Sequence, residues 1–236
     1  MEFRVASIDM FGTLVDIGSI RHAVWRTFLK DRYTAELADE YWNRVGDLLF
    51  QLIDDQIIEE RPYVPLKVIF ETMYSRFFPE ISLDFDPKEA AVVLAHQHPF
   101  STLYDDTVPF LESVSKEYPI CLASDTDDDM LGPLRQLYPF DRVITSEQIE
   151  SYKASADKRF FSEIIDQYGV KPENIIHIGD SSYDIIGAGE VGIVTCWLNR
   201  NDRTWSHDTK PDYEVNSLID AASILGIDID SSEFTP

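Results

Sequence analysis

Acidic side chains come directly after apolar segments at three places in the sequence. Asp9, Ser124-Asp125 and Asp180 each lie at the end of such a segment, and Asp184 follows shortly after. A carboxylate at the end of a buried strand is costly unless it has partners or a function. If the three aspartates 9, 180 and 184 meet, their repulsion requires a hard divalent cation, and oxygen-only ligands suit Mg²⁺. Taken alone, Asp180 and Asp184 could instead form a turn and cap a helix.

Two more side chains could serve the same site. Lys153 lies in a loop between a predicted strand and a predicted helix, where it could neutralise charge on Asp9 and on a bound anion. By itself it is typical of a solvated loop lysine. The Ser124 hydroxyl could bind a phosphoryl or carboxylate oxygen, or simply cap a helix. Gly12 permits a sharp turn after Asp9 because it has no Cβ, and Thr13 offers a hydroxyl close by.

The segments that must position these residues alternate between strands and helices. Apolar runs predict strands at 3–8, 119–124, 142–145, 174–178, 193–198 and 213–215, and helices at 108–118, 128–138, 157–168, 184–190 and 217–225. The helix at 128–138 has to accommodate Pro133. This alternation predicts an α/β fold with a doubly wound parallel sheet. Ligands of such sheets bind beyond the carboxyl ends of the strands, where the acidic residues are expected.

A long stretch from about residue 17 to residue 96 follows helical periodicity throughout. Four helices are expected in it, and no clear strand interrupts them. We therefore expect an all-helical subdomain, residues 17–97, inserted into an α/β core formed by residues 1–16 and 98–236.

Composition limits the partners of this protein. Hydrophobic residues make up 44% of the chain, so a packed core is available. The formal charge of −23 argues against nucleic acid, because phosphate backbones require patches of Lys and Arg. Cys121 and Cys196 lie inside apolar runs and are expected as buried thiols. No signal peptide and no apolar run of roughly 18 residues is seen, so we expect a cytoplasmic monomer or homodimer with no membrane partner.

Four ordered motifs resemble those of the haloacid-dehalogenase-like (HAD) hydrolase superfamily. They are Asp-Met-Phe-Gly-Thr-Leu-Val-Asp at 9–16, Ser124-Asp125, Lys153 and Gly-Asp-Ser-Ser-Tyr-Asp at 179–184. Each motif is weak alone, but four in the right order are specific. The resemblance covers residues 1–16 and roughly 100–225, and the helical insert is similar to the first type of cap in that superfamily. It implies a Rossmann-like core beneath a helical cap.

The resemblance also implies a mechanism. Asp9 would be the nucleophile and would form a covalent ester or an aspartyl-phosphate, which water then hydrolyses. Mg²⁺ would be held by Asp9, the backbone carbonyl of Phe11 and Asp180, with help from Asp184.

Other residues at the matching positions would hold a small anionic substrate, a phosphorylated metabolite or a haloacid. Lys153 and Ser124 would bind the transferring group, together with Thr13 and with backbone N–H groups near Phe11 and Gly12. The cap would close over the site, exclude water and select the substrate.

Phe11 departs from the phosphatase pattern. Phosphatases of this superfamily carry a second aspartate at this position, which protonates the leaving alcohol and later activates water; general acid catalysis is worth ~10²–10⁴-fold. The 2-haloacid dehalogenases place an aromatic residue here, because a halide leaves without a proton. Phe11 therefore favours a metal-independent dehalogenase.

Two other positions favour a phosphatase. The dehalogenases resemble one another in having Ser-Asn where this chain has Ser124-Asp125, and their fourth motif lacks the acid that Asp180 supplies. They also hold the departing halide with a cap arginine. Arg44 is the candidate here, with Arg21 and Arg26 as alternatives.

Three hypotheses follow. The first is a Mg²⁺-dependent hydrolase of a small phosphate ester or anhydride, because two acids and Lys153 form a consistent charge balance. The second is a metal-independent 2-haloacid dehalogenase that forms an aspartyl ester. The third is a catalytically degenerate binding protein, against which the presence of Asp9, Lys153, Asp180 and Asp184 argues.

Overall fold

The core of the protein is a single six-stranded parallel sheet. In the computed structural model, which describes residues 2–229, the strand order is β5-β4-β1-β6-β7-β8. The strands are β1 (Val5–Ile8), β4 (Ile120–Ser124), β5 (Arg142–Thr145), β6 (Ile175–Gly179), β7 (Val194–Leu198) and β8 (Tyr213–Val215). The chain leaves β1 on one side and returns to its other side at β6, so the order reverses beside β1. The predicted doubly wound α/β fold is confirmed.

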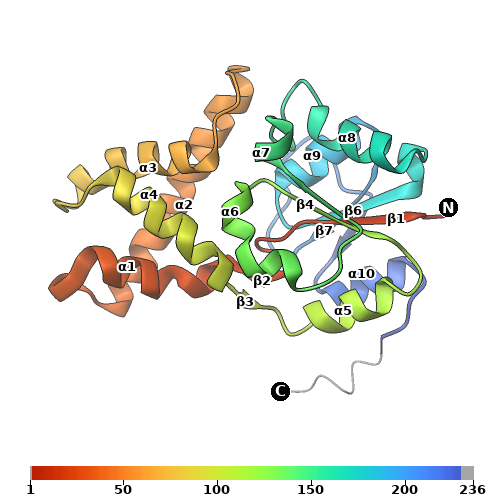
Figure 1. The fold of residues 1–236 in the computed structure, drawn as a ribbon, viewed down its shortest axis with the longest axis horizontal. Helices are drawn as coiled ribbons and strands as arrows, with labels where there is room; N and C mark the ends of the chain where they lie inside the picture. Colours follow the sequence, from red (N-terminus) through yellow and green to blue (C-terminus); the bar gives the residue numbers. More distant parts are fainter. Residues whose placement is uncertain (1, 230–236) are drawn as a thin grey trace.

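Helices cover both faces of the sheet (Figure 1). On one face lie α5 (Thr107–Val114) and α10 (Leu218–Ile224), which pack apolar side chains such as Leu111 and Leu218 against the strands. On the other lie α8 (Arg159–Tyr168) and α9 (Ser182–Glu190), with Phe160, Phe161 and Ala188 in the core. The short helix α7 (Ser146–Ile149) follows β5 directly.

The helix predicted at 128–138 is wrong as a single element. Helix α6 (Asp128–Leu131) ends after four residues, and the chain continues as a 3₁₀ helix from Gly132 to Gln136. Gly132 has a φ of +41°, and a Cβ there would lie 2.9 Å from Pro99 Cγ. Pro133 has no N–H to donate to a helical ladder. Both residues break the helix, and their effect outweighs the apolar periodicity around them.

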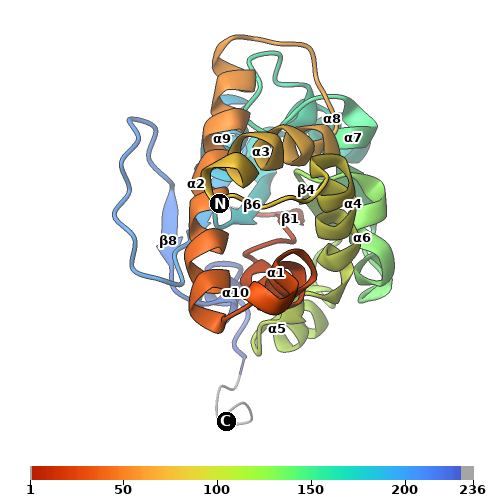
Figure 2. The same ribbon diagram turned by 90° about the vertical axis from the view of Figure 1, so that its left-hand side faces the viewer.

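Four helices pack together beside the carboxyl ends of the strands. They are α1 (Arg21–Leu29), α2 (Ala35–Ile58), α3 (Leu66–Glu80) and α4 (Pro87–Gln97), and Figure 2 views them in front of the sheet. Their shared core is aromatic, and the Trp25 ring lies edge-on to Phe28, Tyr74 and Phe77. Residues 17–97, all described, contain no strand, as predicted. Neither α2 nor any other described helix is long and apolar enough to cross a membrane.

A two-stranded antiparallel ribbon connects these helices to the sheet. It consists of β2 (Val15–Asp16) and β3 (Thr102–Leu103), which are too short to show alternation and were not predicted. Arg200 binds the segments on either side of the ribbon: its guanidinium donates to both carboxylate oxygens of Asp106 at 2.9 Å and to the Thr13 carbonyl at 3.0 Å. The turn that follows β1 is therefore tied to the end of the sheet.

Candidate active site

The first predicted site residue, Asp9, lies at the end of the central strand. Its neighbours in the sheet are β4 and β6, so the side chains at the ends of these strands reach the same point. Asp9 is only 5% exposed. After it the chain turns at Gly12, whose φ of +90° favours glycine. The Gly12 N–H donates to the Val15 carbonyl at 2.8 Å, and its part in substrate binding stays a prediction.

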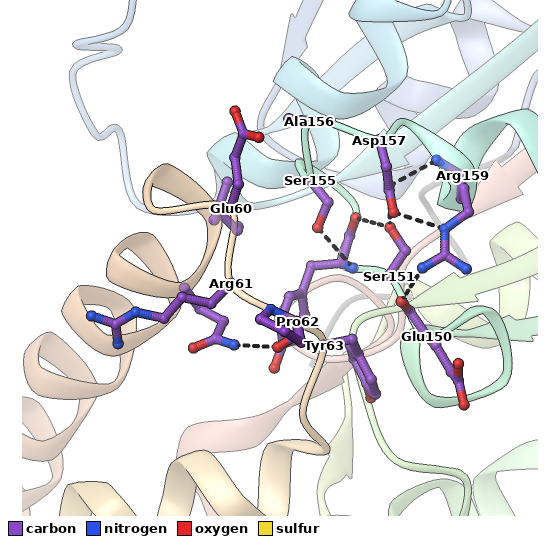
Figure 3. A pocket seen from close by; sticks show the side chains of 13 residues that line it. Glu60, Arg61, Pro62, Tyr63, Glu150, Ser151, Ser155, Ala156, Asp157 and Arg159 are labelled. Atoms are coloured by element: carbon purple, nitrogen blue, oxygen red, sulfur yellow. Dashed lines mark hydrogen bonds and ion pairs between the residues drawn. The ribbon is translucent and has the colours of Figure 1, made fainter.

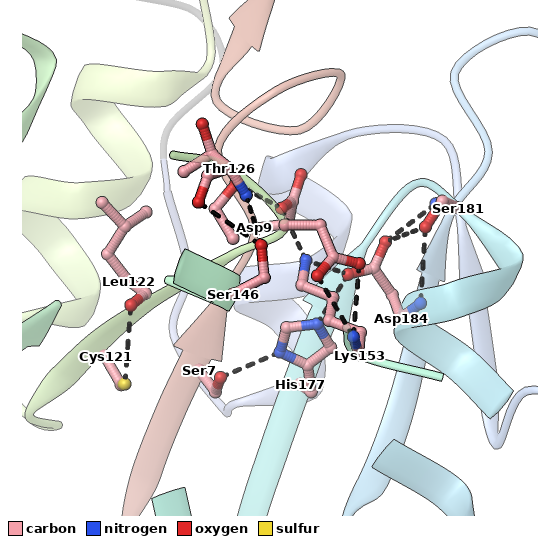
Figure 4. Close-up of polar contacts among 12 residues, drawn as sticks. Ser7, Asp9, Cys121, Leu122, Thr126, Ser146, Lys153, His177, Ser181 and Asp184 are labelled. Carbon is pink, nitrogen blue, oxygen red and sulfur yellow. Dashed lines mark hydrogen bonds and ion pairs between the residues drawn. The ribbon is translucent and has the colours of Figure 1, made fainter. Parts of the chain in front are cut away.

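Lys153 is buried between two of the carboxylates. Its Nζ lies 2.6 Å from Asp9 Oδ1 and 2.6 Å from Asp184 Oδ1, and the residue is 3% exposed (Figure 4). Burial alone would lower the pKa of Lys153, but the attraction of Asp184 and Asp9 outweighs burial and raises it. Lys153 is therefore a charged partner of Asp9 and not a solvated loop lysine.

Asp184 is held by four hydrogen bonds. Its Oδ1 accepts from Lys153 and lies 2.9 Å from His177 Nε2, while Oδ2 accepts from the Ser181 N–H at 3.0 Å and the Ser181 hydroxyl at 2.6 Å. A carboxylate has about four lone-pair directions, and all are used here. Burial would raise the pKa of Asp184, but Lys153 and His177 outweigh it and lower that pKa. The alternative that Asp184 caps a helix is wrong: Ser181 caps α9, and Asp184 completes a capping box.

A buried histidine lies behind this carboxylate. His177 is fully buried, its Nδ1 lies 2.8 Å from the Ser7 hydroxyl, and its ring packs edge-on against Phe161. Burial lowers the pKa of His177, which favours the neutral ring. Sequence reasoning placed His177 behind the strand that leads to Asp180 but did not pair it with Ser7. The available signal was the presence of two polar residues, Ser7 and His177, at one register position of neighbouring apolar strands.

Asp180 completes a group of three carboxylates. Oxygen atoms of Asp9, Asp180 and Asp184 all lie within 4.8 Å of one another. Burial, reinforced by the charges of the other aspartates, raises the pKa of Asp180 to about 7 and that of Asp9 to about 6. Arg203 offers little compensation, because it lies 3.5 Å from Asp180 Oδ2 and is half exposed. These three carboxylates could together hold a metal ion.

The backbone of Asp180 is held by two residues that sequence reasoning did not assign to the site. Its carbonyl accepts from Trp197 Nε1 at 2.9 Å and from Arg203 at 2.6 Å. Trp197 is the penultimate residue of β7, which pairs with the strand that leads to Asp180, so this contact depends on the strand order.

Ser124 and Asp125, which follow each other at the end of β4, reach the same carboxyl edge of the sheet. The Ser124 hydroxyl donates to Asp9 Oδ1 at 3.1 Å. The Asp125 carboxylate accepts from the Lys153 N–H at 3.1 Å, and burial raises the pKa of Asp125 to about 7. Thr13 is fully buried, and its hydroxyl has no hydrogen-bond partner among the described residues.

Phe11 and Arg44, two predicted substrate-binding residues, make their side-chain contacts with residues outside the group of carboxylates. The half-buried Phe11 ring packs edge-on against His98, with 5.0 Å between the ring centroids. Arg44 is not brought to the carboxylates: its side chain is 42% exposed, it pairs with Glu80 at 2.8 Å, and it lies over the Phe77 ring. Of the alternatives, Arg21 pairs with a cap residue at 2.5 Å and Arg26 lies over a cap tyrosine.

Fold and site together define a class of enzyme. An aspartate at the end of the central strand, paired with a buried lysine and surrounded by hydroxyl and carboxylate groups, can attack an electrophilic centre and form a covalent intermediate. A family model described as haloacid dehalogenase-like hydrolase matches residues 3–192. The chain belongs to this family and is a hydrolase.

Relatives of two kinds match most of the chain. It is 22% identical to an (S)-2-haloacid dehalogenase from Pseudomonas fluorescens, over 93% of this chain and 95% of the relative. It is 27% identical to a glyceraldehyde 3-phosphate phosphatase from Methanopyrus kandleri, over 83% of this chain and 94% of the relative. The structure of the L-2-haloacid dehalogenase from Xanthobacter autotrophicus with chloropropionic acid covalently bound matches with a TM-score of 0.81 at 16% identity, covering 95% and 98% of the two chains. Dehalogenases and phosphatases therefore both stand among the relatives.

Proposed function

We propose that the protein hydrolyses a small phosphate ester or anhydride with the aid of Mg²⁺, through a phosphoryl group carried on Asp9. The position of Asp180 carries this proposal. Its carboxylate joins those of Asp9 and Asp184, and only Lys153 among the described residues brings a buried positive charge to this group. A divalent cation would balance the charge that remains.

The oxygen atoms that could hold the cation differ between the three aspartates. Asp9 accepts its two side-chain hydrogen bonds, from Ser124 and Lys153, on Oδ1, which leaves Oδ2 for a ligand. The Asp180 carboxylate is 25% exposed, and among residues 2–229 its only side-chain contact is the one to Arg203 at 3.5 Å. These two aspartates, with the Phe11 carbonyl, would hold the ion, whereas the four bonds of Asp184 suit it to holding Lys153. When bound, Mg²⁺ would neutralise charge on the phosphoryl group as a Lewis acid.

The residues of the chain supply the covalent chemistry. A free oxygen of Asp9 attacks phosphorus, and the bond between phosphorus and the leaving oxygen breaks with its electron pair on that oxygen. Water then attacks the same phosphorus, the bond to Asp9 breaks, and inorganic phosphate leaves with the carboxylate restored. Lys153 and Ser124, which already reach Asp9, would bind the phosphoryl oxygens as charge builds up on them.

Phe11 restricts the leaving group. A phenyl ring donates no proton, so an alcohol would have to leave as a poorly stabilised alkoxide. The leaving groups of acyl phosphates, of pyrophosphates and of esters of acidic alcohols depart without this help. We therefore propose an activated phosphate as the substrate.

Dehalogenation of a 2-haloacid is the second candidate. Phe11 favours it, and so does the haloacid dehalogenase that matches 93% of the chain. In that reaction Asp9 attacks the carbon that bears the halogen, halide leaves with the bonding electrons, and water hydrolyses the ester. This chemistry gives no role to Asp180.

A substrate panel with matched variants tests the two candidates. The purified protein is assayed with acetyl phosphate and p-nitrophenyl phosphate, in Mg²⁺ and in EDTA, and with 2-chloropropionate for chloride release. We expect phosphate release that EDTA abolishes and that both Asp9→Asn and Asp180→Asn reduce at least 100-fold. Chloride release that persists in EDTA and in Asp180→Asn, without phosphate release, would establish the second candidate instead.

A further inference from the structure

Helix α3 of the cap begins without a capping side chain of its own. The residue before it is Pro65, which has neither a hydroxyl nor a carboxylate to offer. The first four N–H groups of a helix have no partner inside the helix. In α3, the N–H groups of Val68 and Ile69 donate to the Pro65 carbonyl, at 2.9 and 3.4 Å. The N–H groups of Leu66 and Lys67 need a partner from elsewhere.

The α/β core provides that partner. Asp127 Oδ1 accepts from the Leu66 N–H at 2.8 Å, and Oδ2 accepts from the Lys67 N–H at 3.1 Å. Asp127 is fully buried, and its carboxylate faces the positive end of the helix dipole. A capping residue normally precedes its helix directly, but Asp127 lies 61 residues after Leu66. The contact therefore joins the cap to the core.

Asp127 belongs to the loop that carries Ser124, and this loop is fixed to the core. The Thr126 N–H donates to the Ser146 hydroxyl at 3.0 Å, and the Asp128 N–H donates to Glu147 at 2.7 Å. Ser124, at the start of the loop, donates to the nucleophile candidate Asp9. A short path through Asp127 and Ser124 thus leads from the first turn of α3 to the Asp9 carboxylate.

A second contact joins the same part of the cap to the loop of Lys153. The hydroxyl of Tyr152 donates to the Val64 carbonyl at 2.6 Å, and the Tyr63 and Tyr152 rings are 5.0 Å apart. A cavity of about 280 Å³ lies beside this contact, between the loop that precedes α3 and the loop around Ser155 (Figure 3). Both loops line the cavity, and they meet at residues 63 and 64 through Tyr152.

We propose that Asp127 is a positioning residue: it caps α3 from the core and thereby sets the cap over Ser124 and Asp9. Removal of the carboxylate would leave two helix N–H groups without a partner and release the first turn of α3 from the Ser124 loop. The proposal goes beyond the hydrolase activity and holds for either class of substrate, because it concerns how the cap is seated.

The test compares two capping aspartates. Asp86 caps the cap helix α4 and accepts from the Glu89 N–H at 2.8 Å, but it belongs to the cap itself. Asp127→Ala and Asp86→Ala therefore each remove one capping carboxylate, and only the first breaks a contact between cap and core. Asp129→Asn is a further control, because it removes the exposed ion pair with Lys67 and keeps the helix cap. Thermal unfolding checks that each variant folds.

Hydrogen exchange without substrate gives the first readout. In Asp127→Ala we expect amide exchange at least tenfold faster both at 63–70 and across the joint at 124–128 and 152–156. In Asp86→Ala the increase should stay near 86–91. Asp127→Asn keeps one acceptor oxygen and should give an intermediate result. Faster exchange confined to α3 in Asp127→Ala would overturn the proposal, whatever the substrate proves to be.

Turnover of the activated substrate gives the second readout. We expect Asp127→Ala to lower kcat/KM at least tenfold, and Asp86→Ala and Asp129→Asn to change it less than threefold. Partial recovery in Asp127→Asn would support positioning through the helix cap. Equal losses in Asp127→Ala and Asp86→Ala would show a general effect of cap stability and contradict the proposal.

Discussion

Gly12 lies so close to Asp180 that a Cβ atom at residue 12 would come within 2.6 Å of the carboxylate oxygen Oδ1. The turn after the nucleophile candidate and the end of β6 therefore depend on each other. A side chain at residue 12 would have to push the Asp180 carboxylate out of the site.

Gly12→Ala is expected to weaken both folding and cation binding. The φ of +90° strains any residue with a Cβ, and the displaced Asp180 loses its place beside Asp9. We expect a loss of about 1–3 kcal/mol in the free energy of unfolding and at least tenfold weaker Mg²⁺ binding, measured by denaturant unfolding and calorimetry. Gly46→Ala is the control: it lies within α2 with nothing within 4 Å, so it should stabilise by roughly 0.5–1 kcal/mol and leave Mg²⁺ binding unchanged.

Asp180→Asn should make the metal-free protein more stable at alkaline pH. The pKa of Asp180 is raised to about 7 in the folded state, so between pH 4 and pH 7 the folded protein holds more protons than the unfolded chain. The contribution of Asp180 to the free energy of unfolding is therefore fully present below pH 4. It is lost as pH rises through 7, where the buried carboxyl group must ionise. We expect the variant to exceed the wild type by on the order of 2 kcal/mol at pH 8 and to equal it at pH 4.

Thermal unfolding in EDTA at the two pH values measures this difference. Asp47→Asn removes the same charge from an exposed position on α2 and serves as the control. Saturating Mg²⁺ at pH 8 should reverse the order of wild type and Asp180→Asn, because only the wild type binds the ion tightly. A variant that is no more stable than the wild type at pH 8 would argue against the raised pKa.

Ser7 and His177 should contribute to stability as one unit with Asp184. Loss of one partner leaves a buried polar group without a hydrogen bond, at a cost of about 1–3 kcal/mol. His177→Phe keeps a ring against Phe161 but removes both bonds. We expect Ser7→Ala and His177→Phe each to destabilise, and the double variant to be less destabilised than the sum by at least about 0.5 kcal/mol. Simple additivity in the double-mutant cycle would show that the bonds act independently.

Phe11→Asp should extend the range of phosphate substrates. The new carboxyl group can protonate an alkoxide, so turnover of an alkyl ester such as glycerol 2-phosphate should rise at least tenfold, within the ~10²–10⁴ range of general acid catalysis. Acetyl phosphate needs no proton and should change little. Phe11→Asn has the same shape without the acid and serves as control. A similar rise in both variants would show that the smaller side chain, and not the acid, causes the effect. No rise in either would mean that protonation of the leaving group does not limit turnover.

Much of the fold was predictable because its signals are local. The strands at β1, β4, β6 and β7 are short apolar runs, and their alternation with helices sufficed for the parallel sheet. Gly12 and the residues at the strand ends followed from backbone freedom and from the cost of burying charge. The helix at 128–138 was wrong because Gly132, with a φ of +41°, and Pro133 outweigh the apolar periodicity around them.

The sequence by itself determined which residues could do chemistry and the end of the sheet to which they belong. Residue type and strand pattern sufficed for Asp9, Ser124 and Asp180, because the carboxyl ends of parallel strands share one edge. Only the tertiary structure decided how these groups are partnered. Ser7 and His177 are 170 residues apart, and Asp127 and Leu66 are 61 apart. No local pattern specifies such contacts, since they form only when the sheet order and the cap bring distant segments within hydrogen-bonding distance.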